Sequence, residues 1–120
     1  MKIAVSCKGT TPESIVDQHF GRSVHFLLYD TDSGIWECCS KDRENTSLKT
    51  AVIKEARFVQ QLGASIIISG HVGLKGCREL HKENIRYYTT PDQSALNAVA
   101  AFSRGELAEI PPFDLEEKWK

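Results

Sequence analysis

Short apolar runs rich in branched and aromatic residues recur along the chain and predict five strands. The first run is KIAVSC, at residues 2–7. The runs VHFLLYD (24–30) and IWECCS (35–40) are separated by a short polar turn, which predicts an antiparallel hairpin. The unbroken run SIIIS (65–69) is typical of a parallel strand covered on both faces. The run IRYY (85–88) predicts the fifth strand.

Three other segments have apolar residues three and four positions apart, which is the spacing of one face of a helix. The first covers residues 48–62, the second includes residues 74–80, and the third runs from residue 91 to about residue 104. Thr90, followed by Pro91 and Gln93, matches a helix-start pattern, so we expect Thr90 to cap the third helix.

The order of these elements predicts one α/β domain. We expect a meander of the first three strands, followed by right-handed parallel crossovers. The result is a three-layer α/β/α arrangement around a mixed five-stranded sheet of order 3-2-1-4-5, with strand 2 antiparallel. We place this domain at residues 1–105. Residues 106–120, which include two adjacent prolines and five acidic residues, are expected to form an irregular C-terminal extension.

The composition narrows the classes of partner. The chain has 120 residues, a net charge of −1, 41% hydrophobic residues and 26% charged residues. A nucleic-acid partner normally requires a basic excess, and a membrane span requires a much longer apolar run, so neither is expected. We expect a cytoplasmic protein. Its four cysteines include no CxxC pair, so a structural zinc site is not indicated, and reduced thiols are expected in that compartment.

A binding site is expected where two unusual loops meet. In an open α/β sheet, ligands bind beyond the carboxyl ends of the strands, at the point where connections leave in opposite directions. The long loop of residues 8–23 follows the first strand, and residues 69–73 follow the fourth strand. These loops contain His19 and His71, and imidazole is a common ligand of iron, copper and zinc. Cys7, at the end of the first strand, is a third candidate ligand.

Other residues of these loops favour an anionic ligand. Arg22 carries a planar guanidinium that can pair with an anion. Gly70, Gly73 and Gly76 surround the start of the second helix, where backbone N–H groups attract anions. We expect Phe20 mainly to anchor its loop by packing.

At this point the sequence resembles a known family. The stretches SIVDQHFGRSVHFLLYD, LGASIIISGHVGLKGCREL and ENIRYY, in this order, are similar to the dinitrogenase iron–molybdenum cofactor biosynthesis domain family. This family includes nitrogenase accessory proteins that carry the cofactor or its precursor. The resemblance implies a ribonuclease-H-like fold and the binding of an anionic metal–sulfur cluster, with the histidine of the HFGR segment as a cluster ligand, here His19. The residues expected to border the cluster are Phe20, Gly21, Arg22, Gly70, Val72 and Gly73.

The leading hypothesis is therefore a non-catalytic carrier of an iron–molybdenum or related metal–sulfur cluster, which receives it from a donor protein and passes it to an acceptor protein. One alternative is a regulatory or protein-interaction domain that binds a small anion or no ligand. Another is a metal-dependent nuclease or phosphotransferase, but such an enzyme needs clustered carboxylates on the central strands. The runs at residues 2–7 and 65–69 contain no carboxylate.

Overall fold

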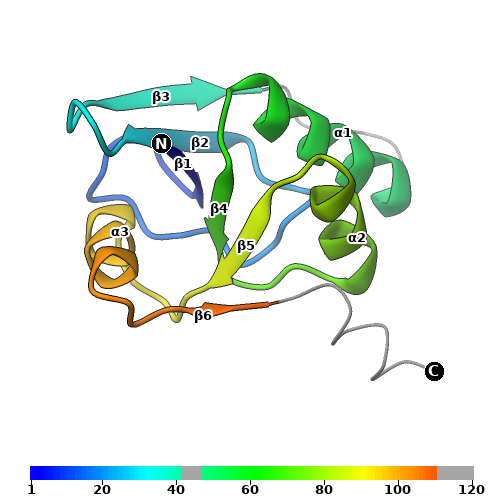
Figure 1. The fold of residues 1–120 in the computed structure, drawn as a ribbon. Helices are drawn as coiled ribbons and strands as arrows, with labels where there is room; N and C mark the ends of the chain where they lie inside the picture. The colour runs from blue at the N-terminus through cyan, green and yellow to red at the C-terminus, as the bar shows by residue number, and fades with distance from the viewer. Residues whose placement is uncertain (42–46, 111–120) are drawn as a thin grey trace.

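The computed structural model describes residues 1–41 and 47–110, which form one sheet with helices on both of its faces (Figure 1). The first strands are followed by helices that alternate with strands. The elements are β1 (Lys2–Cys7), β2 (His25–Asp30), β3 (Trp36–Ser40), α1 (Leu48–Gln61), β4 (Ile66–Ser69), α2 (Leu74–Lys82), β5 (Arg86–Thr89), α3 (Ala95–Ser103) and β6 (Ala108–Glu109).

The strands have the order β3-β2-β1-β4-β5-β6. The predicted order of the first five strands is confirmed, with β2 antiparallel to β1 and β4 parallel to β1. The predicted number of five strands is wrong, because residues 108–109 add an antiparallel strand beside β5. Arg86 and Glu109 form an ion pair across these two strands. A strand of two residues gives almost no periodicity, which explains why the sequence did not indicate it.

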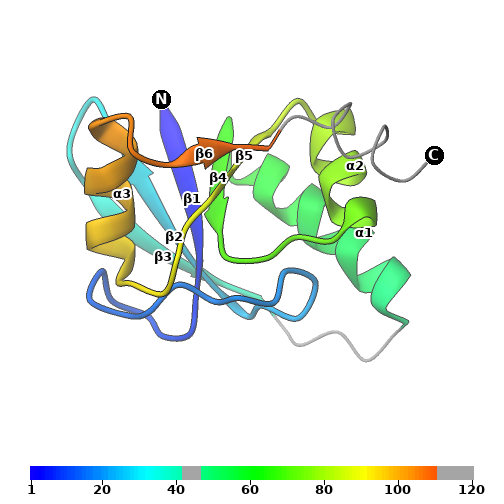
Figure 2. The same cartoon turned by 90° about the horizontal axis from the view of Figure 1, so that it is seen from below.

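Two apolar cores lie on opposite faces of the sheet because side chains alternate along each strand. On one face, Ala4, Phe26 and Ile67 pack with α1 and α2. On the other face, Val5 and Ile68 pack with α3. Figure 2 shows α3 on one side of the sheet and the pair α1 and α2 on the other side.

The start of α3 differs from the sequence prediction. Ser94 is the N-cap, and its hydroxyl accepts a hydrogen bond from the backbone N–H of Asn97. Thr90 does not cap the helix but accepts a hydrogen bond from the Gln93 side chain, at 2.6 Å. Both residues belong to the connection between β5 and α3, whose path depends on contacts outside the local sequence. One such contact is the hydrogen bond from Val16 N–H to the Gln93 carbonyl.

The division between residues 1–105 and 106–120 stays a prediction. The first part of the extension is ordered against the sheet, since Ile110 packs against the core shared with α1 and α2. Residues 111–120 lie outside the described residues. None of the helices in the described ranges is long and apolar enough to cross a membrane.

Candidate functional site

The loop after β1 turns back along the carboxyl end of that strand. Cys7 and Val16 form an antiparallel bridge, and the backbone N–H of Asp17 donates to the carbonyl of Ser6 at 2.7 Å. The Ser6 hydroxyl also donates to the Ser69 hydroxyl at 2.8 Å, which links the ends of β1 and β4. The chain therefore reaches the HFGR segment (residues 19–22) with its backbone already fixed to the central strands.

The GHVG segment (residues 70–73) runs beside the HFGR segment. The N–H of His71 donates to the carbonyl of Gln18 at 3.2 Å, and the N–H of Phe20 donates to the carbonyl of His71 at 3.3 Å. His19 and His71 are partners in a parallel bridge. The prediction that the two loops converge at the switch point between β1 and β4 is confirmed.

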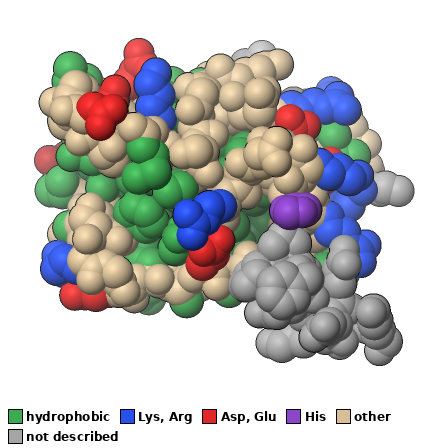
Figure 3. Space-filling model, viewed as in Figure 1, with side chains coloured by type: hydrophobic (Ala, Val, Ile, Leu, Met, Phe, Trp, Pro, Cys, Tyr) green, Lys and Arg blue, Asp and Glu red, His purple; other side chains and the backbone are tan. Residues whose placement is uncertain are grey.

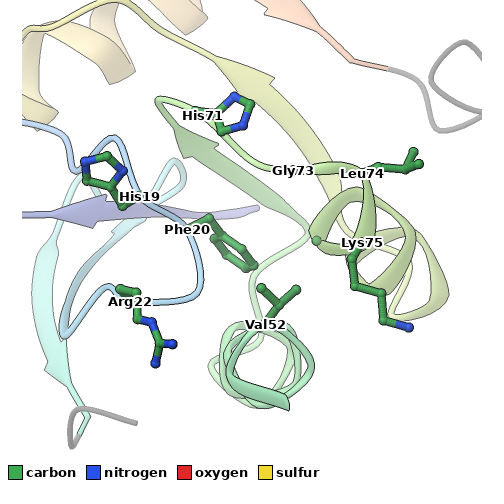
Figure 4. Close-up of a pocket in the computed structure, with 9 residues that line it drawn as sticks. His19, Phe20, Arg22, Val52, His71, Gly73, Leu74 and Lys75 are labelled. Carbon is green, nitrogen blue, oxygen red and sulfur yellow. The ribbon is translucent and has the colours of Figure 1, made fainter. Parts of the chain in front are cut away.

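A pocket of about 760 Å³ opens between these segments and the helices α1 and α2. Its lining combines the two histidines and two cations with apolar side chains and glycines. The lining residues are His19, Phe20, Arg22, Val52, His71, Gly73, Leu74, Lys75 and Gly76. Figure 4 shows Phe20 reaching from the HFGR segment toward Val52 of α1, while Arg22 and Lys75 extend on opposite sides of the pocket.

Close packing of α2 against Phe20 forms the inner wall. A Cβ atom on Gly76 would lie 2.6 Å from a methyl carbon of Val72 and 3.2 Å from the Phe20 ring. Only glycine allows this approach, so Gly76 fixes how near the first turn of α2 comes to the HFGR segment. Phe20 and Val72 are both buried, which confirms that Phe20 anchors its loop.

The pocket favours negative charge. Among the residues that the structure describes, its lining contains Arg22 and Lys75 and no Asp or Glu. The helix α2 begins at the pocket, and Gly73, its N-cap, has no side chain to bond the first-turn N–H groups. These N–H groups and the positive end of the helix dipole attract anions. Figure 3 shows further Lys and Arg side chains gathered on the side of the molecule formed by α1 and α2.

Lys75 is held beside the pocket by an ion pair. Its Nζ atom lies 3.0 Å from Glu79 Oε1, one turn further along α2. Hydrogen bonds from Lys75 and Lys82 lower the pKa of Glu79, so this carboxyl stays ionised near neutral pH. The pair orients Lys75, while Glu79 itself does not line the pocket.

Only some of the residues proposed from the sequence meet in this pocket. His19, Phe20, Arg22, His71 and Gly73 line it. The lining does not include Gly21, Gly70 or Val72. Gly21 and Val72 are buried, and the side chain of Gln18 covers the position where a Cβ of Gly70 would lie.

Cys7 does not reach this pocket. Its side chain is 1% exposed and lines a smaller cavity of about 280 Å³ together with Asp17, Arg22 and His25. Burial, with a smaller contribution from Asp17, raises the pKa of Cys7 to about 12. Cys7 as a ligand stays a prediction that this geometry does not support.

Comparison with known protein families identifies the family of this chain. The family profile described as dinitrogenase iron-molybdenum cofactor matches residues 1–105. The chain belongs to this family. No curated protein matches it.

Solved structures from three organisms share the fold. A putative NifB protein from Thermotoga has 26% sequence identity and a TM-score of 0.75, and the match covers 90% of this chain and 91% of that one. The apo form of the orange protein from Desulfovibrio gigas has 23% identity and a TM-score of 0.80, with coverage of 91% and 92%. A putative dinitrogenase from Methanocaldococcus jannaschii has 20% identity and a TM-score of 0.60, with coverage of 92% and 94%.

The sequence prediction missed several residues of the site in this family member. Val52, Leu74 and Lys75 line the pocket. They lie on α1 and α2, where apolar and charged residues are common on any helix face, so nothing in the sequence distinguished them. Glu55 was also missed, although it carries a signal. It occupies the apolar face of α1, between Val52 and Val59, where a charged residue is unexpected.

The Glu55 carboxylate lies directly under the HFGR segment. Its Oε2 atom accepts a hydrogen bond from the backbone N–H of Gly21 at 2.8 Å. Its Oε1 atom lies 3.5 Å from Lys41 Nζ, an ion-pair distance too long for a good hydrogen bond. Burial raises the pKa of Glu55 to about 7, against the opposing effects of Gly21 and Lys41.

Proposed function

We propose that this protein is a non-catalytic carrier that binds an anionic iron–molybdenum or related metal–sulfur cluster during cofactor biosynthesis or delivery. The observation that carries this proposal is the pairing of His19 and His71 at one pocket that also contains Arg22 and Lys75 and that, within residues 1–41 and 47–110, has no acidic lining residue. The family match over residues 1–105 supports a role in the handling of iron–molybdenum cofactor.

The chemistry of the pocket fits a cluster that carries its own bridging ligands. In the described ranges, no three His, Cys, Asp or Glu side chains are grouped so that they could hold a single metal ion. A preformed cluster needs few ligands from the protein because its metals are already bridged by sulfide. Two imidazoles can supply such ligands, while the cations and helix N–H groups balance the sulfide charge.

A small number of direct protein ligands also makes it easier to release the cluster to an acceptor protein. A site closed around a metal holds it as part of the fold, whereas a carrier must give its cargo to an acceptor. We propose His19 and His71 as the direct ligands, with Phe20, Gly73, Leu74 and Val52 as the apolar and backbone surroundings. The partners are then cluster donor and acceptor proteins, and we place this exchange in the cytoplasm.

Anaerobic reconstitution tests the proposal. The apo protein is mixed with isolated iron–molybdenum cofactor without oxygen, passed through a desalting column, and examined by absorption spectroscopy and by counting iron and molybdenum. We expect both metals to elute with the protein in the ratio of the cofactor. If neither metal elutes with the protein, the protein is not a carrier of iron–molybdenum cofactor.

A phosphate-binding measurement, taken together with the reconstitution, distinguishes the carrier from the leading alternative. A domain that binds only a small anion would bind inorganic phosphate in the same pocket and would retain no iron. Phosphate binding is measured by calorimetry on the apo protein, with the variant His19→Ala as the comparison. Phosphate binding without cluster retention would favour the regulatory or protein-interaction reading over the carrier.

A further inference from the structure

Glu55 is a charged side chain in a place that normally excludes charge. It is 0% exposed and lies on the face of α1 that packs against the sheet. Moving an ionised carboxylate from water into such a place costs several kcal/mol unless strong partners compensate. A well-packed apolar side chain would give a more stable helix face, so the carboxylate needs an explanation beyond stability.

The contacts of this carboxylate lead to the HFGR segment. Oε2 bonds the N–H of Gly21, the residue between Phe20 and Arg22. Gly21 has a φ of 102°, a conformation that other residues rarely adopt. The chain turns at this point, since the N–H of Arg22 donates to the carbonyl of His19 at 3.2 Å. Glu55 therefore holds the residue at which the backbone turns between two pocket-lining side chains.

Lys41 holds the carboxylate from the other side. It directly follows β3, its side chain is only 10% exposed, and its N–H donates to the carbonyl of Val24 at 2.9 Å. Asp17, on the loop before the HFGR segment, also acts on Glu55 as a nearby negative charge. The carboxylate thus connects α1, the end of β3 and the HFGR segment.

We infer that Glu55 is a positioning residue of the cargo site, which acts through the backbone N–H of Gly21 to set the direction of His19 and Arg22. The inference rests on the proposed function and extends it, because Glu55 does not line the pocket and would not touch the cargo. The role requires an acceptor atom at this place. A side chain of similar size without an acceptor would leave Gly21 N–H buried without a partner.

Two substitutions of Glu55 distinguish the effect of its hydrogen-bond acceptor from the effect of its side-chain size. Glu55→Gln keeps a carbonyl oxygen that can accept from Gly21, whereas Glu55→Met keeps the approximate size and removes the acceptor. Val59→Ala is the matched control, because Val59 is equally buried on the same helix and belongs to the core rather than to the HFGR contact. This control lowers stability without touching Gly21.

Two measurements are made on each variant. The first is hydrogen exchange of the Gly21 amide in the apo protein by NMR. The second is the rate at which isolated iron–molybdenum cofactor is lost from the loaded protein. For Glu55→Met we expect both rates to rise about tenfold or more, the size expected for loss of a hydrogen bond to a charged group. We expect Glu55→Gln to recover most of the parent behaviour, and Val59→Ala to leave cofactor loss unchanged.

The outcomes are distinguishable. If the parent protein retains no cofactor, its role as a carrier of iron–molybdenum cofactor fails, while the Gly21 exchange rates still decide whether Glu55 positions the segment. If Glu55→Met folds with parent rates in both measurements, the inference is overturned. If Glu55→Met does not fold, Lys41→Met replaces it, since removing the cation weakens the hold on the carboxylate. Parent rates of Gly21 exchange and of cofactor loss in Lys41→Met would also overturn the inference.

Discussion

His19 and His71 lie side by side as partners in a parallel bridge, although they come from loops that follow different strands. Both side chains line the same pocket, and both are exposed. Figure 4 shows their rings on neighbouring segments at one end of that pocket. This pairing depends on β1 and β4 being adjacent and parallel, since only then do the two loops leave the sheet at the same edge.

The first prediction concerns this pair. His19→Ala should reduce retention of the iron–molybdenum cofactor while changing the free energy of unfolding of the apo protein by no more than about 0.5 kcal/mol, because an exposed side chain makes few stabilising contacts. Metal counting after desalting and urea unfolding measure the two quantities. His81→Ala, on the exposed face of α2, is the control. Equal retention by the His19 and His81 variants would show that His19 is not a ligand.

A second prediction concerns Arg22. Arg22→Ala should weaken cofactor retention, and the loss should be larger at low salt, because the screening length is about 30 Å at 0.01 M and about 8 Å at 0.15 M ionic strength. Arg22→Lys keeps the charge and should lose less. Retention is measured for both across a salt series, with Arg57→Ala on the exposed face of α1 as the control. A loss independent of salt would argue against a charge-balancing role.

The start of α2 gives a third prediction. Gly73 has a φ of −66° and open space around its Cβ position, so Gly73→Asp can be accommodated. The new carboxylate should bond the first-turn N–H groups, raise stability by a few tenths of a kcal/mol, and reduce cofactor retention by occupying the anion-binding position. Ser94→Asp, at the N-cap of α3, is a matched control that should not change retention. Unchanged cofactor retention in Gly73→Asp would show that the start of α2 does not contribute to cofactor binding.

A fourth prediction follows from the pKa of Glu55. Burial raises this pKa from 4.5 to about 7, so the folded protein holds the proton more tightly than the unfolded chain. As the pH rises between these two values, the unfolded chain ionises first, and the free energy of unfolding falls by up to about 3 kcal/mol. The variant Glu55→Gln lacks this contribution, so its stability relative to the parent should increase over that pH range. Urea unfolding of both apo proteins from pH 5 to pH 8 checks this, and parallel curves would contradict it.

The cysteines provide a fifth prediction. Cys38 is exposed, whereas Cys7 and Cys77 are buried and burial raises their pKa values to about 12 and about 11. At pH 8, about one in a thousand or fewer of these buried thiols is ionised, and the thiolate is the reactive form. Iodoacetamide should therefore modify Cys38 first in the folded protein, as read by mass spectrometry. Modification of Cys7 at the rate of Cys38 would show that the core around Cys7 opens in solution.

The strand pattern is where prediction from the sequence succeeded. Apolar runs identified β1 to β5, and the short turn between β2 and β3 with the helical connections after them fixed the spatial order. Once β1 and β4 are neighbours, the HFGR and GHVG segments must lie at one edge. The sequence therefore placed His19, Arg22, His71 and Gly73 at one edge of the sheet, where the structure shows them lining one pocket.

The tertiary structure decided what each residue of these segments faces. Glu55 and Gly21 are separated by 34 positions and meet only because α1 packs beneath the HFGR segment. Cys7 ends the same strand that leads to the site, yet β1 directs its side chain into the core shared with α3, away from the pocket. Local periodicity reports which face of an element is buried, and the amino-acid sequence by itself determined that much. Which partner covers that face depends on how separate elements pack, so the contacts of Glu55 and Cys7 appear only in the folded chain.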